Sequence, residues 1–164
     1  MSKIDLDVMY VQNPAIGAAV LWRFVCGSYN NENRPVPFPL LFVVLPIVFR
    51  QDLCDVITST QKASGLSKAS EKLFKKREND SIHFVNNTAI QMRDLTLEAF
   101  NIAVEANLIS LIAESATVFP LTTSVCNNTR KGDTKDMMAA AEKLGAWCSG
   151  LTMLEIAKWL KVRF

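Results

Sequence analysis

An uninterrupted apolar stretch, residues 36–49 (VPFPLLFVVLPIVF), constrains the fold of this chain more than any other sequence feature. As an ideal α-helix it would measure about 21 Å, which is short of the roughly 30 Å hydrocarbon core of a bilayer. It also contains Pro37, Pro39 and Pro46, and Pro46 is expected to break or kink a helix. We therefore predict a buried core helix rather than a membrane span. An apolar groove for a partner protein is the alternative.

The composition is that of a folded domain. The chain has 164 residues, of which 49% are hydrophobic and 21% charged. A chain of this length buries roughly 70% of the surface that its unfolded form exposes, so it can build a core without metal or disulfides. Such apolar content excludes a disordered chain. The net charge of +2 is too small to indicate a nucleic-acid-binding protein by itself. We predict a single domain over residues 1–164.

The cysteine and histidine spacing argues against a metal site. The four cysteines lie at positions 26, 54, 126 and 148 without a CxxC pair, and His83 is the single histidine. Structural zinc needs clustered thiolate and imidazole ligands. No secretory signal is evident in residues 1–10. We therefore predict reduced thiols, a cytoplasmic location, and neither a metal nor another cofactor.

The N-terminal part of the chain, 13–60, reads as a set of apolar helices. Asn13 suits the N-cap of a helix, and Pro14 suits its first position. This helix is predicted to continue through residue 26, and nearly every side chain in it is apolar. The polar tract 27–35 (GSYNNENRP) predicts a loop after it. The apolar stretch and a shorter amphipathic segment then complete this part.

The middle of the chain, 66–122, has the helix–helix–hairpin order of a winged helix. Two further helices are predicted within 133–164, and Thr152 and Glu155 have the capping-box spacing at the head of the second. The predicted fold is mainly α with a short β-hairpin: a winged-helix-like central unit flanked by buried N-terminal helices and two C-terminal helices. The elements expected in the middle part are helices over 66–77, 81–93 and 95–107 and strands over 108–113 and 117–122.

One helix of the middle part carries a concentrated positive patch. Apolar residues of the helix over 66–77 lie toward one side, and cationic residues populate the other. Such a face is a candidate contact for DNA phosphate or for an acidic partner, and a solvated helix face is the plainer alternative. The candidate residues are Lys68, Lys72, Lys75, Lys76 and Arg77.

A winged helix would normally read DNA bases with its second helix, here 95–107 (LTLEAFNIAVEAN). That helix contains Glu98 and Glu105 and no Lys or Arg. Its charge therefore has the wrong sign for the electrostatic attraction that supplies most DNA affinity. We expect it to serve as a core element or a protein-binding face.

No arrangement of residues predicts catalysis. The chain has no GxSxG, Walker A or HExxH motif and no glycine-rich phosphate loop, and its acidic residues are scattered. We therefore predict that it is not an enzyme and has no catalytic residues. Large side chains on helices are candidates for a partner interface, with core anchoring as the default for the tryptophans. These candidates are Trp22, Arg23, Trp147 and Trp159.

Several segments, taken in order, indicate a family. They are NPAIGAAVLWRFV (13–25), PVPFPLLFVVLPIVF (35–49), LTLEAFNIAVEANLISL (95–111) and the closing AEKLGAWCSGLTMLEIAKWLKVRF (141–164). In this order, with a basic amphipathic helix between the second and third, the chain resembles the middle components of bacterial three-component ABC systems. These include the small subunit of Lamassu-type anti-phage and anti-plasmid defence. The resemblance covers most of the chain.

The resemblance implies a non-enzymatic subunit. In that family a large SMC-like ATPase senses foreign DNA, an effector that is often a nuclease executes the response, and the small middle component holds the two together. The hypothesis is thus an accessory subunit of a defence complex, with an SMC-like ATPase and an effector nuclease as partners, contact with DNA through the complex, and no membrane. The rival hypothesis is a free-standing winged-helix DNA-binding regulator.

Overall fold

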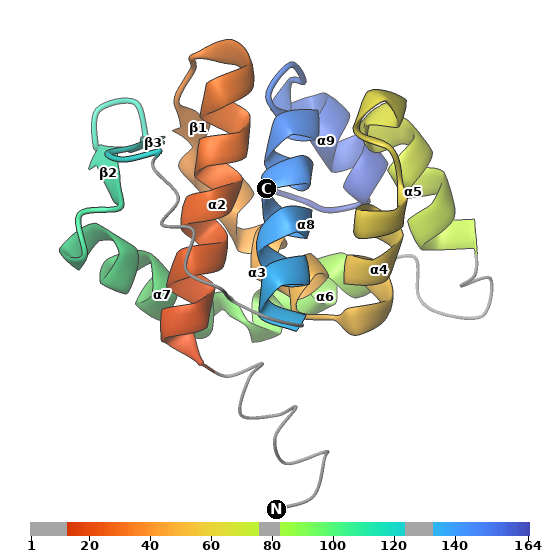
Figure 1. The fold of residues 1–164 in the computed structure, drawn as a ribbon, viewed down its shortest axis with the longest axis horizontal. Helices are drawn as coiled ribbons and strands as arrows, with labels where there is room; N and C mark the ends of the chain where they lie inside the picture. The colour runs from red at the N-terminus through yellow and green to blue at the C-terminus, as the bar shows by residue number, and fades with distance from the viewer. Residues whose placement is uncertain (1–12, 76–82, 124–132) are drawn as a thin grey trace, which may run out of the picture.

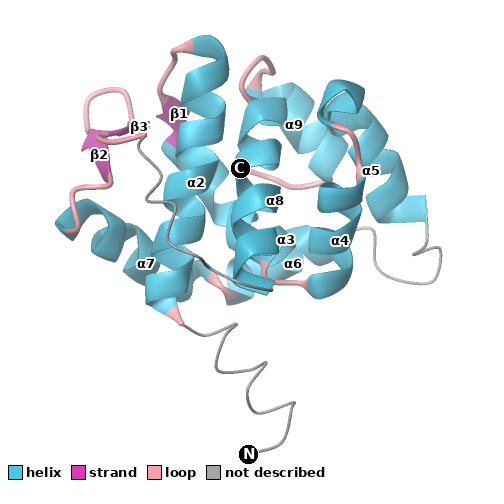
Figure 2. Cartoon of the chain, viewed as in Figure 1, coloured by secondary structure: helices cyan, strands magenta, loops and turns pink. Residues whose placement is uncertain are grey.

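The computed structural model describes residues 13–75, 83–123 and 133–164. The described part is mainly helical with one small antiparallel sheet, as predicted (Figure 2). Two long helices, α2 (Pro14–Glu32) and α8 (Asp133–Cys148), lie side by side in the middle of the molecule, and the other elements pack around them (Figure 1). No helix in the described ranges is both long and apolar enough to cross a bilayer.

Helix α2 begins where the sequence predicts and ends six residues later than expected. The side chain of Asn13 accepts hydrogen bonds from the backbone N–H groups of Ala15 and Ile16, at 2.9 and 3.4 Å, and Pro14 takes the first position. The helix then continues through Gly27 to Glu32 and ends at Asn33, whose left-handed backbone has a φ of 53°. The prediction of a loop over 27–35 is therefore wrong for residues 27–32.

The reason for this difference is a close helix crossing. A Cβ atom on Gly27 would lie 2.1 Å from the carbonyl oxygen of Glu142 in α8, and one on Gly145 would lie 2.1 Å from that of Phe24 in α2. Each glycine thus lets the backbone of the other helix approach. Glycine inside a helix costs about 1 kcal/mol relative to alanine, and this packing offsets that cost. Gly27 is a packing residue and not a helix stop.

The apolar stretch 36–49 is buried, but it is not one helix. It forms strand β1 (Val36–Pro37), the 3₁₀ helix η1 (Phe38–Val43) and the short helix α3 (Val44–Val48). The prolines explain the division, because a proline lacks the N–H that an α-helix uses beyond its first turn. Most of the stretch belongs to the core, which overturns the alternative of an open groove for a partner.

The hairpin predicted after residue 107 is present, and it gains a third strand. Strands β2 (Ile109–Ile112) and β3 (Thr117–Pro120) pair antiparallel, and β1 pairs with the other edge of β3, so that Val36 lies opposite Val118. The turn contains no glycine; Ala116 adopts a positive φ of 50° instead. Helices α6 (Phe84–Gln91) and α7 (Arg93–Glu105) precede the hairpin, which is the predicted order. The winged-helix arrangement itself stays a prediction.

The remaining helices cover the opposite side of α8. They are α4 (Gln51–Ser59), the 3₁₀ helix η2 (Lys62–Ser64), α5 (Gly65–Lys75) and α9 (Met153–Leu160). The predicted capping box of α9 is confirmed, because Thr152 and Glu155 each bind the other's backbone N–H. One cluster of buried apolar side chains joins residues from α2, α3, α5, α7, α8 and α9. This shared core fixes the exposed faces of α5 and α7 relative to each other.

Candidate functional site

Helix α5 presents the predicted lysines on one exposed side. Leu66, Ala69 and Leu73 are buried against the core, whereas Lys68, Lys72 and Lys75 are exposed. The three lysines are four and three residues apart, a spacing that places them on the same helix face. Lys76 and Arg77, also candidates, lie outside the described residues.

Helix α9 enlarges this positive surface. The hydroxyl of Ser70 in α5 donates a 2.6 Å hydrogen bond to the carbonyl oxygen of Trp159 in α9, which joins the two helices. Lys161 Nζ then lies 4.5 Å from the centre of the Phe74 ring of α5, within the range of a cation–π contact. The residues that α9 and its C-terminal extension add are Lys158, Lys161 and Arg163.

The surface formed by η2, α5 and residues 153–164, here named the basic face, has a strong charge surplus. Its side chains include seven cations and only two carboxylates, a surplus of five positive charges in a chain whose net charge is +2. Among the described residues, Lys68 is the one member of this face with an ion-pair partner, Glu71 at 3.9 Å, and both are exposed. The face can therefore attract phosphate or carboxylate groups.

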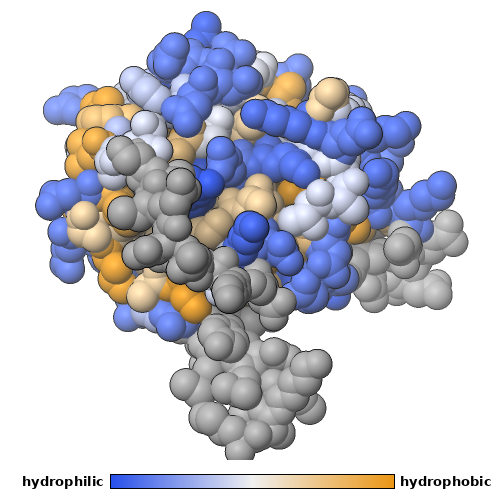
Figure 3. Space-filling view, viewed as in Figure 1, coloured by the Kyte–Doolittle hydropathy of each residue, from blue (hydrophilic) through white to orange (hydrophobic). Residues whose placement is uncertain are grey.

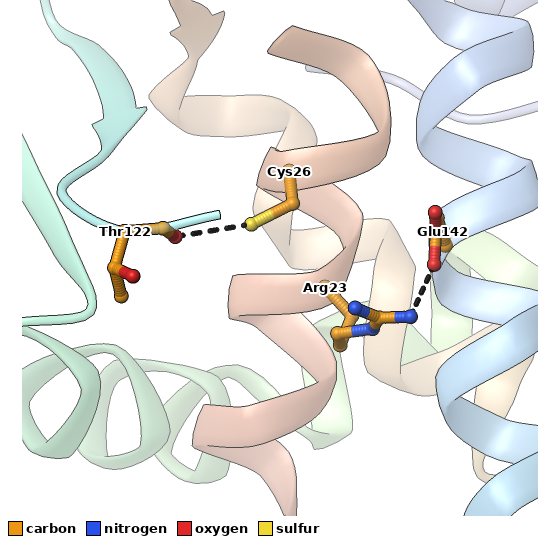
Figure 4. A network of polar contacts seen from close by, with 4 residues as sticks. All are labelled: Arg23, Cys26, Thr122 and Glu142. Atoms are coloured by element: carbon orange, nitrogen blue, oxygen red, sulfur yellow. Dashed lines mark hydrogen bonds and ion pairs between the residues drawn. The ribbon is translucent and has the colours of Figure 1, made fainter. Parts of the chain in front are cut away.

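Trp22 and Arg23 lie elsewhere, at the junction of α2, α8 and the segment after β3, where Figure 4 shows Arg23 with Cys26, Thr122 and Glu142. Trp22 Nε1 donates a 2.8 Å hydrogen bond to the carbonyl oxygen of Thr122, and Cys26 Sγ lies 3.5 Å from the same oxygen. The guanidinium of Arg23 forms an ion pair with Glu142, while its Nε is buried without a hydrogen-bond partner among the described residues. This junction holds the end of the hairpin against α2.

The thiol of Cys26 at this junction stays protonated near neutral pH. Burial raises the pKa of Cys26 to about 11; the charge of Arg23 opposes the rise and that of Glu142 adds to it. Burial likewise raises the pKa of Cys148 to about 12. A thiol must be ionised to attack, so neither side chain is activated near neutral pH. Cys54 is also a buried thiol, and Cys126 lies outside the described residues.

Trp147 and Trp159 differ in exposure. Trp147 is buried, and its Nε1 donates a 2.8 Å hydrogen bond to the carbonyl oxygen of Lys62, so the structure supports core anchoring for this side chain. Trp159 is half-buried beneath the basic face, where Lys158 Nζ lies 5.2 Å from its ring centre. Trp22 is half-buried as well. Contact with a partner stays a prediction for Trp22, Arg23 and Trp159.

Lys143 of α8 has a structural role that the sequence does not indicate. Its Nζ donates hydrogen bonds to the carbonyl oxygens of Ile57, Thr58 and Thr60, at 3.1, 3.0 and 2.9 Å. These carbonyls lie at the C-terminal end of α4, where the helix has no partners of its own for them and where a positive charge is favourable. Lys143 therefore fastens α4 to α8 and is not available to a ligand.

Within the residues that the structure describes, no three His, Cys, Asp or Glu side chains gather in a way that could hold a metal ion. Of the predicted site residues, Lys68, Lys72 and Lys75 lie on α5, which a hydrogen bond joins to the backbone of Trp159 in α9, and Trp22 and Arg23 lie elsewhere. The sequence prediction missed the contribution of α9 and the residues after it, although three cations within residues 158–163 (KWLKVR) are a signal that could have indicated it.

These features define a small, mainly helical protein whose candidate sites are surfaces. The whole chain, residues 1–164, matches the family described as ABC-three component (ABC-3C) system Middle Component 3. The chain therefore belongs to this family, which confirms the resemblance to a middle component of a three-component ABC system. No match to a curated protein or to a solved structure accompanies it.

Proposed function

We propose that this chain is a non-enzymatic accessory subunit that joins an SMC-like ATPase to an effector nuclease in a Lamassu-type complex acting against phage and plasmid DNA. Membership of a middle-component family supports a subunit that works with protein partners. The missing catalytic motifs of the sequence support a role without chemistry of its own. The cytoplasm is the compartment that suits such a complex.

The observation that carries the proposal is the uneven charge of the molecule. The basic face has a surplus of five positive charges, so the rest of the chain has a net charge of −3. In Figure 1, α5 lies at one end of the long axis, with α9 between it and α8, and α7 with the hairpin lies at the other end. A subunit with chemically different ends suits a position between two different neighbours.

We further propose that the basic face contacts DNA phosphate within the complex and reads no bases. Lysines on a helix surface bind phosphate as point charges, and such contacts carry no sequence information. The exposed side of α7 carries Asp94, Glu98 and Glu105, which repel phosphate. This acidic side argues against the alternative of a winged-helix regulator that would insert α7 into the major groove.

Charge reversal on α5 tests this proposal. The variant Lys68→Glu/Lys72→Glu/Lys75→Glu should weaken DNA binding by the assembled complex, because each lost phosphate contact lowers the slope of log K against log salt by about 0.9. The loss of all three contacts lowers the slope by about 2.7. DNA binding measured by fluorescence anisotropy over a salt series gives this slope directly.

The matched control reverses three exposed cations elsewhere, Arg34→Glu/Arg93→Glu/Lys135→Glu, and so produces the same change in net charge. We expect this control to keep most of the slope and both variants to assemble with the ATPase. An α5 variant with wild-type DNA binding would show that this face is only solvated. An α5 variant that loses the ATPase but keeps DNA binding would make it a protein-docking face.

A further inference from the structure

The β2–β3 hairpin has an apolar face that the core does not cover. Partners in the ladder lie on the same side of the sheet, so Ile112 and Thr117 share a face with Ser110 and Phe119, and Leu121 follows on that face. The opposite face carries Ile109 and Val118, which are buried in the core, and Leu111, which is 41% exposed. Ile112 and Phe119 are half-buried without belonging to the core cluster, and Leu121 is 50% exposed.

We name Ile112, Phe119 and Leu121 the outer hairpin face. Apolar side chains gather at this end of the molecule, over the hairpin and α7 (Figure 3). Val104, near the end of α7, is 37% exposed. The end of α7 lies close to the base of the hairpin, because the backbone N–H of Leu121 donates to the carbonyl oxygen of Leu108 and the N–H of Leu108 donates to that of Ala103. The apolar patch thus continues from the hairpin onto the end of α7. Grouped exposed apolar residues of this kind are typical of protein-binding surfaces.

Carboxylates lie near both ends of the hairpin that carries this apolar patch. Glu105 ends α7 before the base of the hairpin, and Glu114 lies in its turn, at the far end of strands that are about 13 Å long. Asp94 and Glu98 continue the acidic side along α7. Over residues 93–123 these four carboxylates face a single cation, Arg93. An apolar centre with a charged rim is the usual anatomy of a protein interface, and this rim is acidic.

We propose that the outer hairpin face docks a segment of another subunit that presents apolar side chains between lysines or arginines. The inference rests on the proposed function, because it requires that the chain is part of a complex. The charge of the rim selects the occupant: the acidic carboxylates attract a basic polypeptide and repel nucleic acid and anionic lipid. Trp22 lies at the border of this surface, since its indole binds the carbonyl oxygen of Thr122, the residue after Leu121.

Zero-length cross-linking tests the proposal. The chain is co-expressed with the ATPase and the effector of its own system, and the purified complex is treated with a carbodiimide, which couples a carboxylate to an amine in direct contact. We expect links from Glu105 or Glu114 to lysines of one partner subunit. The variant Glu105→Lys/Glu114→Lys should abolish these links and raise the Kd for that partner roughly tenfold at low salt.

The matched control is Glu32→Lys/Asp136→Lys, which reverses two exposed carboxylates away from the hairpin and should bind normally. Leu121→Asp removes apolar contact at an exposed position and should also weaken binding of the same partner. Wild-type affinity in both hairpin variants would overturn this inference alone. Links from Glu105 or Glu114 to Lys158 or Lys161 of a second copy would replace it with self-association. Failure of the wild-type chain to bind either subunit would overturn the proposed function itself.

Discussion

At the scale of single residues, the buried thiols of Cys26 and Cys148 make the stability of the fold decrease at alkaline pH. Their pKa values rise from 9.0 to about 11 and about 12, because burial disfavours the thiolate. In the unfolded chain these thiols ionise near their ordinary pKa, while in the folded chain they stay protonated. Their contribution to stability is therefore complete below pH 9 and decreases as the pH rises from there toward the folded values.

We predict that the free energy of unfolding falls between about pH 9 and pH 10.5, by at most about 1.4 kcal/mol per pH unit for each of these two thiols. Urea unfolding curves across this range measure the effect. Other groups titrate there too, so the double variant Cys26→Ser/Cys148→Ser is the comparison: its stability should depend less steeply on pH. Equal slopes for the two proteins would contradict the assignment of the effect to these thiols.

Side chains that bind across the fold are the residues that the sequence could least predict. The N-cap Asn13 and the capping box at Thr152 were predictable because each acts on neighbours within three residues. Lys143 reads in the sequence as one more surface cation, yet it binds three carbonyls of a helix more than eighty residues earlier. Its partners depend on the packing of α4 against α8, which no local pattern contains.

At the scale of elements, the crossing of α2 and α8 decides where helices end. Gly27 looks like a stop signal beside a polar tract, but the tertiary contact keeps it helical. Strand β1 was missed for a related reason, because its two residues become a strand only by pairing with β3, some eighty residues later. The lysines of α5 were predictable from helical spacing, whereas the addition of α9 to the basic face follows from the packing of the two helices.

We predict that Gly145→Ala destabilises the protein by more than about 2 kcal/mol. The new Cβ would lie 2.1 Å from a backbone oxygen of α2, so the two central helices would have to move apart. Overpacking of this kind typically costs about 1–3 kcal/mol or more, which exceeds the gain of about 1 kcal/mol in helix propensity from alanine. Chemical denaturation of both proteins measures the difference.

Gly150→Ala is the matched control, because the nearest atom to its Cβ would be Glu32 Oε1 at 3.7 Å, an ordinary contact. The control should change stability by less than about 0.5 kcal/mol, as surface substitutions usually do. A Gly145→Ala protein as stable as this control would show that the helices do not cross as closely as described here.

At the scale of the whole molecule, two surfaces with opposite charge lie on either side of the central helices α2 and α8 (Figure 1). The basic face of α5 and α9 suits phosphate, and the acidic rim around the outer hairpin face suits a basic protein segment. One core connects them, so each surface is held in a fixed position relative to the other. For the non-enzymatic subunit that we propose, this arrangement is a physical means to hold two larger components together.

The most direct test of this account is the composition of the assembly. The tagged chain is expressed together with its neighbouring genes at natural levels, purified at moderate salt, and its complexes are weighed by native mass spectrometry. The account predicts a species that contains this chain, an SMC-like ATPase and an effector nuclease. A stable homodimer that binds a specific DNA sequence, without either protein partner, would contradict it and favour the regulator.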